Sequence, residues 1–171
     1  MTRLFSILLI LLSYSCFAQE QPEIMYRIEN QNEDVCGYVN AQGDTLIPFG
    51  ECIACFSDSL PYAIVVKWDD QSYGFPAFNA KGEEVFRVFV YDNGPDYIEE
   101  GTFRIVKDGK IGYASVSGEI IVPPMYEAAW PFENGRAMVS IHADKETDGE
   151  HSWWVNTDDF YIDKKGNRIE E

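Results

Sequence analysis

Apolar and polar residues alternate in short runs along most of the chain after residue 18, and most runs end in a polar turn that contains glycine. A period of two is typical of a half-buried β-strand, and two such runs joined by a Gly-containing turn of three to five residues predict a β-hairpin. No stretch after residue 18 shows the 3.6-residue period of an amphipathic helix. The pattern therefore predicts an all-β fold of antiparallel hairpins.

The hairpin pattern occurs four times, in segments that begin near Cys36, Tyr73, Ile111 and Phe160. Each segment has alternating residues, a polar corner that ends in glycine, and then an apolar strand. The four corners are Asn40–Gly43, Asn79–Gly82, Ser115–Gly118 and Asp163–Gly166. Glycine at the last corner position permits a positive φ, and Asn, Ser or Asp at the first position accepts local backbone hydrogen bonds.

A second piece recurs between the hairpins, most clearly at 125–141, and reads as a bend, a Pro–aromatic step, a glycine turn and a strand. Each unit therefore offers about three short strands, which bury a shared core only when units stack. We expect one domain, residues 19–171, that forms a curved sheet, a solenoid or a partly open barrel. The expected units are approximately 35–66, 73–107, 110–142 and 153–171, and the segment from Gln19 to Asp34 and the truncated last hairpin would form the caps.

The third unit, at 108–139, resembles the WG repeat, which is found in tandem in many bacterial proteins and typically reads GKWGYID..G.IVIPP.YD.A..F..GLA.V. The segment agrees with this pattern at about two-thirds of its positions. It departs at Ile111, where the family has Trp, and Cys36 and Tyr73 stand there in the first two units. The resemblance covers 35–171 and implies a β-rich repeat scaffold without a general catalytic motif, so no active residues are carried over.

The first 18 residues predict a cleavable signal peptide. Arg3 is the only charged residue there, an apolar run extends from Leu4 to Leu12, and the small residues Cys16 and Ala18 precede a cleavage site at Gln19. The run is far shorter than the roughly 20 apolar residues of a spanning helix, so no transmembrane span is expected. We expect export to the periplasm or the extracellular space, with a lipid anchor at Cys16 as the alternative.

The charge of the chain restricts its partners. Without the leader, 12 Lys and Arg residues stand against 29 Asp and Glu residues, a net charge of −17. Such a surface repels nucleic acid and anionic lipid headgroups, and it suits cations or a basic partner. The acidic residues are spread along the chain, which is typical of a solvated acidic surface.

Three cysteines remain after the leader, namely Cys36, Cys52 and Cys55. An oxidising compartment permits one disulfide between two of them and leaves one thiol over, and the pairing stays open. Cys52 and Cys55 form a CxxC pattern, which could be a redox centre or, with Cys36 and either His142 or His151, a zinc site. No βαβ pattern and no second CxxC surround it, so we expect structural cysteines.

An acidic segment near the C-terminus has the start of a calcium-loop pattern. Asp144, Glu146 and Asp148 stand at its positions 1, 3 and 5, and Gly149 follows at position 6. Position 12 is Val155 where a bidentate Glu belongs, and the flanking residues read as strands. We therefore expect a solvated hairpin loop and no metal, with these three acids as weak candidate ligands.

Trp153 and Trp154 adjoin on a predicted strand, so their side chains point to opposite faces. One would enter the core, and an exposed one could stack on a sugar or peptide ring; the alternative is that both are packed.

Sequence signatures of serine hydrolases, phosphate loops, dinucleotide sites and zinc peptidases are missing. We therefore expect an exported, non-catalytic binding or scaffold protein of the bacterial envelope, without a cofactor, that recognises a protein or another envelope component. A glycan-binding protein that uses exposed aromatic residues is the first alternative. A small hydrolase is the second, because paired carboxylates are abundant.

Overall fold

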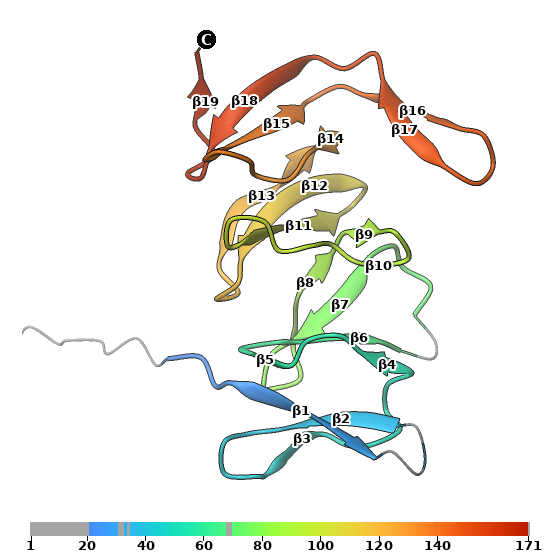
Figure 1. Ribbon diagram of the computed structural model, residues 1–171, viewed down its shortest axis with the longest axis vertical. Coiled ribbons are helices and arrows are strands. Elements are labelled where there is room, and N and C mark those ends of the chain that lie inside the picture. The colour runs from blue at the N-terminus through green and yellow to red at the C-terminus, as the bar shows by residue number, and fades with distance from the viewer. Residues whose placement is uncertain (1–20, 31–32, 34, 68–69, 171) are drawn as a thin grey trace, which may run out of the picture.

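The computed structural model describes residues 21–30, 33, 35–67 and 70–170, and in this part of the chain it contains β-strands and no helix. The predicted all-β fold of antiparallel hairpins is confirmed. The sheets follow one another along the long axis of the molecule, from the N-terminal to the C-terminal end (Figure 1). The expected leader, including Cys16, lies outside the described residues.

The strands are short, as the spacing of the turns requires. They are β1 (Met25–Asn30), β2 (Val35–Val39), β3 (Thr45–Ile47), β4 (Ala54–Cys55), β5 (Ser59–Leu60), β6 (Ala63–Val66), β7 (Phe75–Phe78), β8 (Glu84–Val88), β9 (Val90–Tyr91), β10 (Gly94–Pro95), β11 (Thr102–Lys107), β12 (Lys110–Ser115), β13 (Ile120–Tyr126), β14 (Ala128–Ala129), β15 (Arg136–Ser140), β16 (Asp144–Thr147), β17 (Ser152–Val155), β18 (Asp159–Asp163) and β19 (Arg168–Ile169).

The strands form three larger sheets and two separate hairpins. The strand orders are β3-β2-β1-β5, β13-β12-β11-β8-β7-β6-β4 and β14-β15-β18-β19. The repeated hairpins are β2–β3, β7–β8, β12–β13 and β18–β19, and each pairs with the strand that precedes it, namely β1, β6, β11 and β15. In the other units, the hairpin pairs with the last strand of the preceding unit. Strand β1 occupies the corresponding position for the first unit.

Each repeated corner is closed by similar hydrogen bonds, with fewer side-chain bonds at Ser115 than at the other three corners. In the first corner, Asn40 Oδ1 accepts the N–H groups of Gln42 at 3.0 Å and Asp44 at 2.8 Å, while the Gly43 N–H donates to the Asn40 carbonyl. Side-chain oxygens at the first positions of the other corners accept bonds of the same kind, at Asn79, Ser115 and Asp163. The predicted role of the first corner residue is confirmed.

The repeated glycines mark a close approach of two strands. A Cβ atom on Gly37 or Gly112 would lie 2.6 or 2.3 Å from a carbonyl oxygen of the neighbouring strand, so only glycine fits there. Both glycines stand three residues before their corner, whereas Gly74 stands five residues before its own. Pro76 occupies the corresponding place in the second unit, so the even spacing of the three glycines in the sequence does not reflect structural equivalence.

Three core clusters succeed one another, and strands β6, β11 and β12 each contribute side chains to two of them, so that they form walls between adjacent clusters. On β11, Phe103 and Ile105 belong to the middle cluster, whereas Val106 belongs to the C-terminal one. On β6, Ile64 belongs to the middle cluster and Val65 to the N-terminal one. Because side chains on a strand alternate in direction, a wall strand buried on both faces lacks the apolar–polar alternation of a surface strand.

A hairpin is inserted before the last unit. We expected the fourth unit to begin at Trp153, but this residue lies on β17 and pairs with Glu146 on β16. The fourth unit instead begins with β18, which pairs with β15. The segment Asp144–Thr147, expected as a loop, is therefore a strand, and the β16–β17 hairpin projects from the side of the stack (Figure 1).

Candidate functional site

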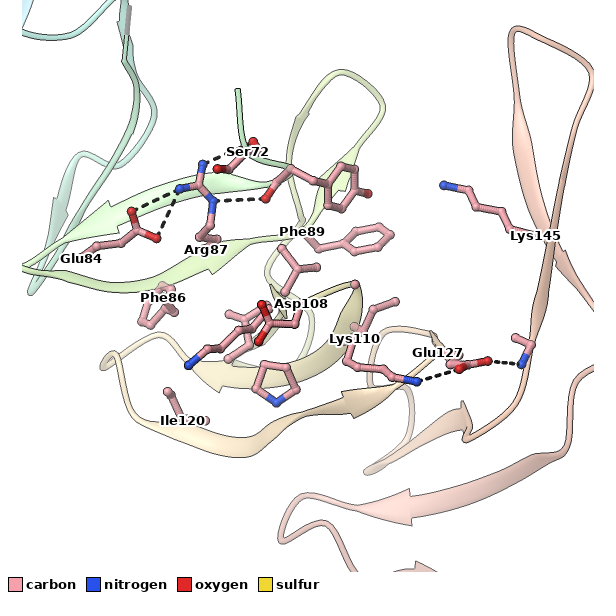
Figure 2. A pocket seen from close by; sticks show the side chains of 18 of the residues that line it. Ser72, Glu84, Phe86, Arg87, Phe89, Asp108, Lys110, Ile120, Glu127 and Lys145 are labelled. Carbon is pink, nitrogen blue, oxygen red and sulfur yellow. Dashed lines mark hydrogen bonds and ion pairs between the residues drawn. The ribbon is translucent and has the colours of Figure 1, made fainter. Parts of the chain in front are cut away.

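A cavity of about 1100 Å³ lies where the second unit, the third unit and the inserted hairpin meet (Figure 2). We call it the main groove. The strand β8, the β11–β12 turn, part of β13 and residues of β16 and β17 contribute to its lining. Its lining combines aromatic rings with basic side chains.

Three aromatic rings form one end of the main groove. Phe89 is in T-shaped contact with Tyr73, with ring centroids 6.1 Å apart, and it lies 6.2 Å from Trp154. Trp154 in turn packs edge-on against Trp130 at 5.1 Å. Tyr73 is 55% exposed, so a flat apolar surface faces solvent beside packed rings.

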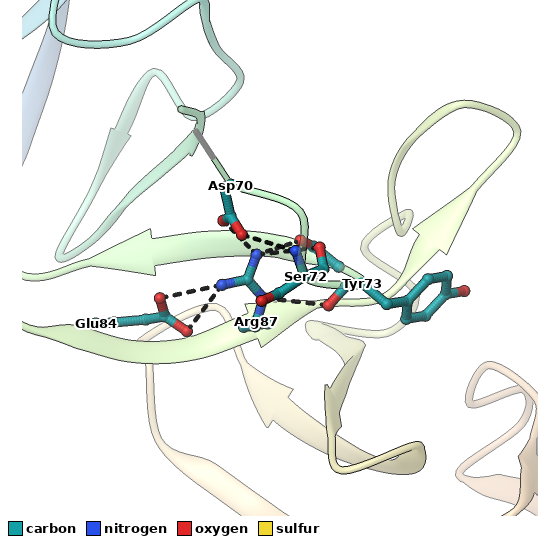
Figure 3. Close-up of polar contacts among 6 residues, drawn as sticks. Asp70, Ser72, Tyr73, Glu84 and Arg87 are labelled. Atoms are coloured by element: carbon teal, nitrogen blue, oxygen red, sulfur yellow. Dashed lines mark hydrogen bonds and ion pairs between the residues drawn. The ribbon is translucent and has the colours of Figure 1, made fainter. Parts of the chain in front are cut away.

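Arg87 fixes the segment that carries Tyr73 (Figure 3). Its guanidinium forms an ion pair with Asp70 at 2.5 Å, contacts Glu84 at 3.2 Å and donates to the Tyr73 carbonyl at 3.1 Å. Partial burial by itself raises the pKa of Asp70, but hydrogen bonds from Arg87 and Ser72 outweigh it and lower the pKa overall. The charge of Arg87 is thus already matched inside the protein.

Glu127 joins the inserted hairpin to the third unit. One carboxylate oxygen lies 2.6 Å from Lys110 Nζ, and the other accepts the Ala143 N–H at 2.9 Å (Figure 2). The hydrogen bond from Lys110, followed by that from Ala143, lowers the pKa of Glu127. The hairpin is therefore anchored at its base, next to the basic lining of the main groove.

Two lysines of the main groove, Lys107 and Lys145, form no ion pair with any residue that the structure describes. Lys145 extends from β16 toward the side of the groove where Phe89 lies (Figure 2). Four basic residues and three acidic residues line the groove, in a chain with a net charge of −16. The main groove is therefore a local exception to an acidic surface, and it suits a ligand that combines a ring with an anionic group.

The structure gives the cysteines separate roles. Cys36 on β2 and Cys55 on β4 form a disulfide with their Cα atoms 6.2 Å apart, and Cys52 is a buried free thiol whose pKa is raised by burial. The CxxC residues are thus not paired with each other. Within the described residues, no three Cys, His, Asp or Glu side chains are arranged to hold a metal ion.

The acidic segment binds its own hairpin. Asp144 accepts a hydrogen bond from the Asn156 side chain at 2.7 Å, and Asp148 accepts the backbone N–H groups of Glu150 and His151 at the turn. Glu146 lies on β16 opposite a residue of β17. The three candidate metal ligands are therefore not brought to one point.

The tryptophan pair divides between two surroundings. Trp153 is 44% exposed, whereas Trp154 is half-buried and lines the main groove. Tyr73, Lys107 and Lys145 were not predicted as binding residues from the sequence. One signal was present, since Lys107 and Lys110 flank an Asp-Gly pair, the pattern of a two-residue hairpin turn that brings both lysines together.

Comparison with known proteins identifies one part of the chain. Residues 111–142 match the model of the WG containing repeat, which confirms the resemblance seen in the third unit. No curated protein and no solved structure shows a significant match to the chain. In the described residues, no helix has the length and apolar character needed to cross a membrane.

Proposed function

We propose that this chain is an exported, non-catalytic binding protein of the bacterial cell envelope, and that it recognises an acidic segment of another protein in the main groove. The observation that carries the proposal is the pairing, in one groove, of exposed aromatic surface with two ammonium groups that have no acidic partner in the described chain. The signal-like leader supports export, and the WG repeat supports a scaffold on which binding surfaces are displayed.

The ligand must supply what the groove lacks. Lys107 and Lys145 call for carboxylates, and the rings of Tyr73 and Trp154 call for an aromatic or proline ring in the same segment. The rest of the surface repels an acidic ligand. Affinity would therefore depend on short-range contacts within the main groove, and little on long-range attraction.

A non-catalytic role is supported by the state of the acids. Glu84 and Glu127, two of the three acids that line the main groove, are engaged in ion pairs. General acid catalysis by a carboxyl group requires a raised pKa, whereas the shifts resolved for carboxyl groups in the described residues are all downward.

An acidic glycan is the second candidate ligand. It is favoured by Trp154 in the groove, since indole rings stack well on sugar faces. A glycan that carries carboxylates would bind the same lysines as an acidic peptide. The two candidate ligands therefore differ in the ring that stacks on the protein, a sugar or a peptide side chain, and in the length of their contact along β17.

Binding of two labelled probes, followed by fluorescence anisotropy, tests the proposal. The probes are a synthetic peptide of alternating Glu and Tyr residues and an oligogalacturonate. We expect the double variant Lys107→Gln/Lys145→Gln to bind the peptide at least tenfold more weakly, because each charge-assisted bond contributes roughly 1.5–3 kcal/mol.

The matched control is Lys81→Gln/Lys165→Gln, which removes the same charge from two exposed corners. Peptide binding that falls equally in both double variants, or that is absent from the wild-type protein, would contradict the proposal. Binding of the oligogalacturonate alone, sensitive to Trp154→Leu and to the lysine pair, would instead establish the glycan candidate.

Export is tested separately by producing the full chain with a C-terminal tag in a Gram-negative host. We expect the tagged protein in the periplasmic or extracellular fraction, with Gln19 as its first residue. A membrane-bound form that begins at a diacylated Cys16 would establish the lipid anchor, and an unprocessed cytoplasmic chain would refute export.

A further inference from the structure

A second cavity of about 550 Å³ opens beside the second unit and shares no lining residue with the main groove. We call it the side groove. Its walls are the segment 56–64, the β9–β10 hairpin with residues 96–98, and single residues of β8 and β11. It is independent of the main groove, so the inference drawn from it goes beyond the proposed function.

The side groove exposes large apolar side chains. Phe56, Tyr91, Tyr97 and Ile98 line it and are 38%, 49%, 58% and 54% exposed. Tyr91 and Tyr97 contact each other edge-on with ring centroids 5.4 Å apart. Apolar residues scattered singly over a surface are ordinary, but a cluster around a cavity is typical of a binding surface.

A tight turn and a buried ion pair hold the segment that carries Tyr91 and Tyr97. Asp92 and Asn93 form the turn of the β9–β10 hairpin with φ values of 46° and 63°, the conformation of a tight two-residue turn. Just after the hairpin, Asp96 accepts hydrogen bonds from Arg104 Nε at 2.9 Å and Nη2 at 2.6 Å, and the two side chains are only 2% and 4% exposed. The Arg104 guanidinium also lies 5.7 Å from the Tyr91 ring.

A buried ion pair of this kind contributes little net stability compared with apolar residues of the same size, but it fixes geometry. Arg104 donates a further bond to the Ala129 carbonyl at 3.0 Å, so it connects the hairpin segment to the third unit. The tyrosines are thereby positioned before any partner arrives, which lowers the entropy cost of binding.

The charge around the side groove is opposite to that of the main groove. Its lining contains three aspartates and no lysine or arginine. Arg104 neutralises Asp96, and Arg27 lies 3.3 Å from Asp58, but Asp92 has no ion-pair partner among the described residues. An acidic rim around exposed tyrosine rings is complementary to a cation, which gains both from the carboxylate and from the ring faces.

We infer that the side groove binds a short basic segment of a partner protein, with an arginine or lysine between Asp92 and the two tyrosine rings and an aliphatic or proline side chain in the cavity. A second copy of this chain is disfavoured as the occupant, because each copy carries a net charge of −16. A membrane surface is disfavoured for the same reason, since anionic headgroups repel the rim.

The test begins with the selection of a phage-displayed random peptide library on the immobilised full-length variant Lys107→Gln/Lys145→Gln, in which the main groove no longer favours acidic peptides. We expect the selected peptides to be enriched in Arg or Lys together with Pro, Leu or aromatic residues. Synthetic copies should bind at least tenfold more weakly to Tyr97→Ser and several-fold more weakly to Asp92→Asn. Asn tolerates the left-handed conformation of this turn, so the second variant removes charge without disturbing the backbone.

The chain supplies matched controls for both variants. Asp108→Asn changes the same turn position in the β11–β12 hairpin, where φ is 51°, but faces the main groove, and Trp153→Ser removes an exposed ring elsewhere. Both should leave peptide binding unchanged, as should Lys107→Gln/Lys145→Gln. Failure to select any peptide, selection of peptides without basic residues, or equal binding to Tyr97→Ser and the wild type would overturn the inference.

Discussion

The second unit differs from the first and third at the position two residues before the corner. Tyr38 and Tyr113 occupy this position in the first and third units, where both are fully buried. The Tyr38 hydroxyl donates to the Ser57 carbonyl at 2.8 Å, and the Tyr113 hydroxyl donates to the Trp130 carbonyl at 2.6 Å. The second unit has Ala77 instead. Two units thus close their interior with the same hydroxyl-to-backbone bond, and one cannot.

The interior of the second unit is filled from its neighbours. Phe86 and Phe103 pack with Tyr62 of the first unit, at centroid distances from 4.9 to 6.1 Å. Strands of this unit also line both grooves, and it holds the buried pair of Asp96 and Arg104. The two regular units close their interiors in the same way, whereas the unit that departs from the pattern is the one that borders both candidate binding surfaces.

The largest effect is expected from the buried ion pair of the second unit. Arg104→Met leaves the Asp96 carboxylate buried without its partner, which should lower the free energy of unfolding by about 3–5 kcal/mol. Urea unfolding followed by tryptophan fluorescence measures this loss. The double variant Arg104→Met/Asp96→Leu should recover most of it, because no charge is left in the core. A loss below about 1 kcal/mol in the single variant would show that the pair is not the anchor of this unit.

The first unit has a covalent constraint instead of an ion pair. Reduction of the bond between Cys36 and Cys55, which closes a loop of sequence separation 19, should lower the free energy of unfolding by about 3 kcal/mol. Urea unfolding with and without reductant gives the value. The variant Cys36→Ser/Cys55→Ser should no longer respond to reductant, whereas Cys52→Ala should respond like the wild type. A response that depends on Cys52 would point to a different pairing.

The tyrosine bond of the third unit should contribute less. Tyr113→Phe removes the hydroxyl that satisfies the Trp130 carbonyl, at an expected cost of roughly 1–2 kcal/mol. Tyr161→Phe is the matched control, because Tyr161 holds the same position in the fourth unit and forms no hydroxyl hydrogen bond to another described residue. If the two substitutions lower the free energy of unfolding equally in thermal or urea unfolding, the tyrosine hydroxyl bond does not distinguish the third unit from the truncated fourth unit.

The smallest effect is a pH dependence confined to one corner. Hydrogen bonds from Asn167, its side chain first, hold the pKa of Asp163 below its usual range. The stabilisation is therefore present above the unfolded-state pKa of about 4 and is lost as the pH falls through the lower folded-state value. Amide exchange, corrected for its intrinsic pH dependence, should show Lys165 losing protection below that value. The Gln42 amide, which binds the neutral Asn40, should keep its protection, and parallel loss at both corners would contradict this.

Much of the fold could be predicted because its determinants are local. The corner residues, the alternation of the strands and the repeat of the third unit are each encoded within a few residues of the structure that they form, and residues 111–142 also match the family model. The second unit is less regular in sequence, because Gly74, like Gly37, is followed by an aromatic residue but stands at a different distance from its corner.

The grooves could not be predicted because their residues come together only through stacking. Tyr73 and Lys145 are far apart in the sequence, and the inserted β16–β17 hairpin brings the lysine to the main groove. No periodic pattern reports which exposed aromatic residues share a cavity. Trp154 was predicted as a candidate binding residue because it is a tryptophan on an expected strand. The residues around it, however, depend on how Glu127 anchors the hairpin at Ala143, and no short sequence pattern predicts that contact.

The wall strands β6, β11 and β12 have a consequence for how the protein loses its structure. Because each contributes side chains to two adjacent cores, the unfolding of one unit exposes buried side chains of the next. The energy that couples neighbours is then comparable to the energy within a unit, which is the regime in which a one-dimensional array unfolds in a single transition. A truncation that removes part of a wall strand should therefore unfold the units on both sides of it. Natural variation in length is accordingly expected to occur as the gain or loss of whole units or of side hairpins.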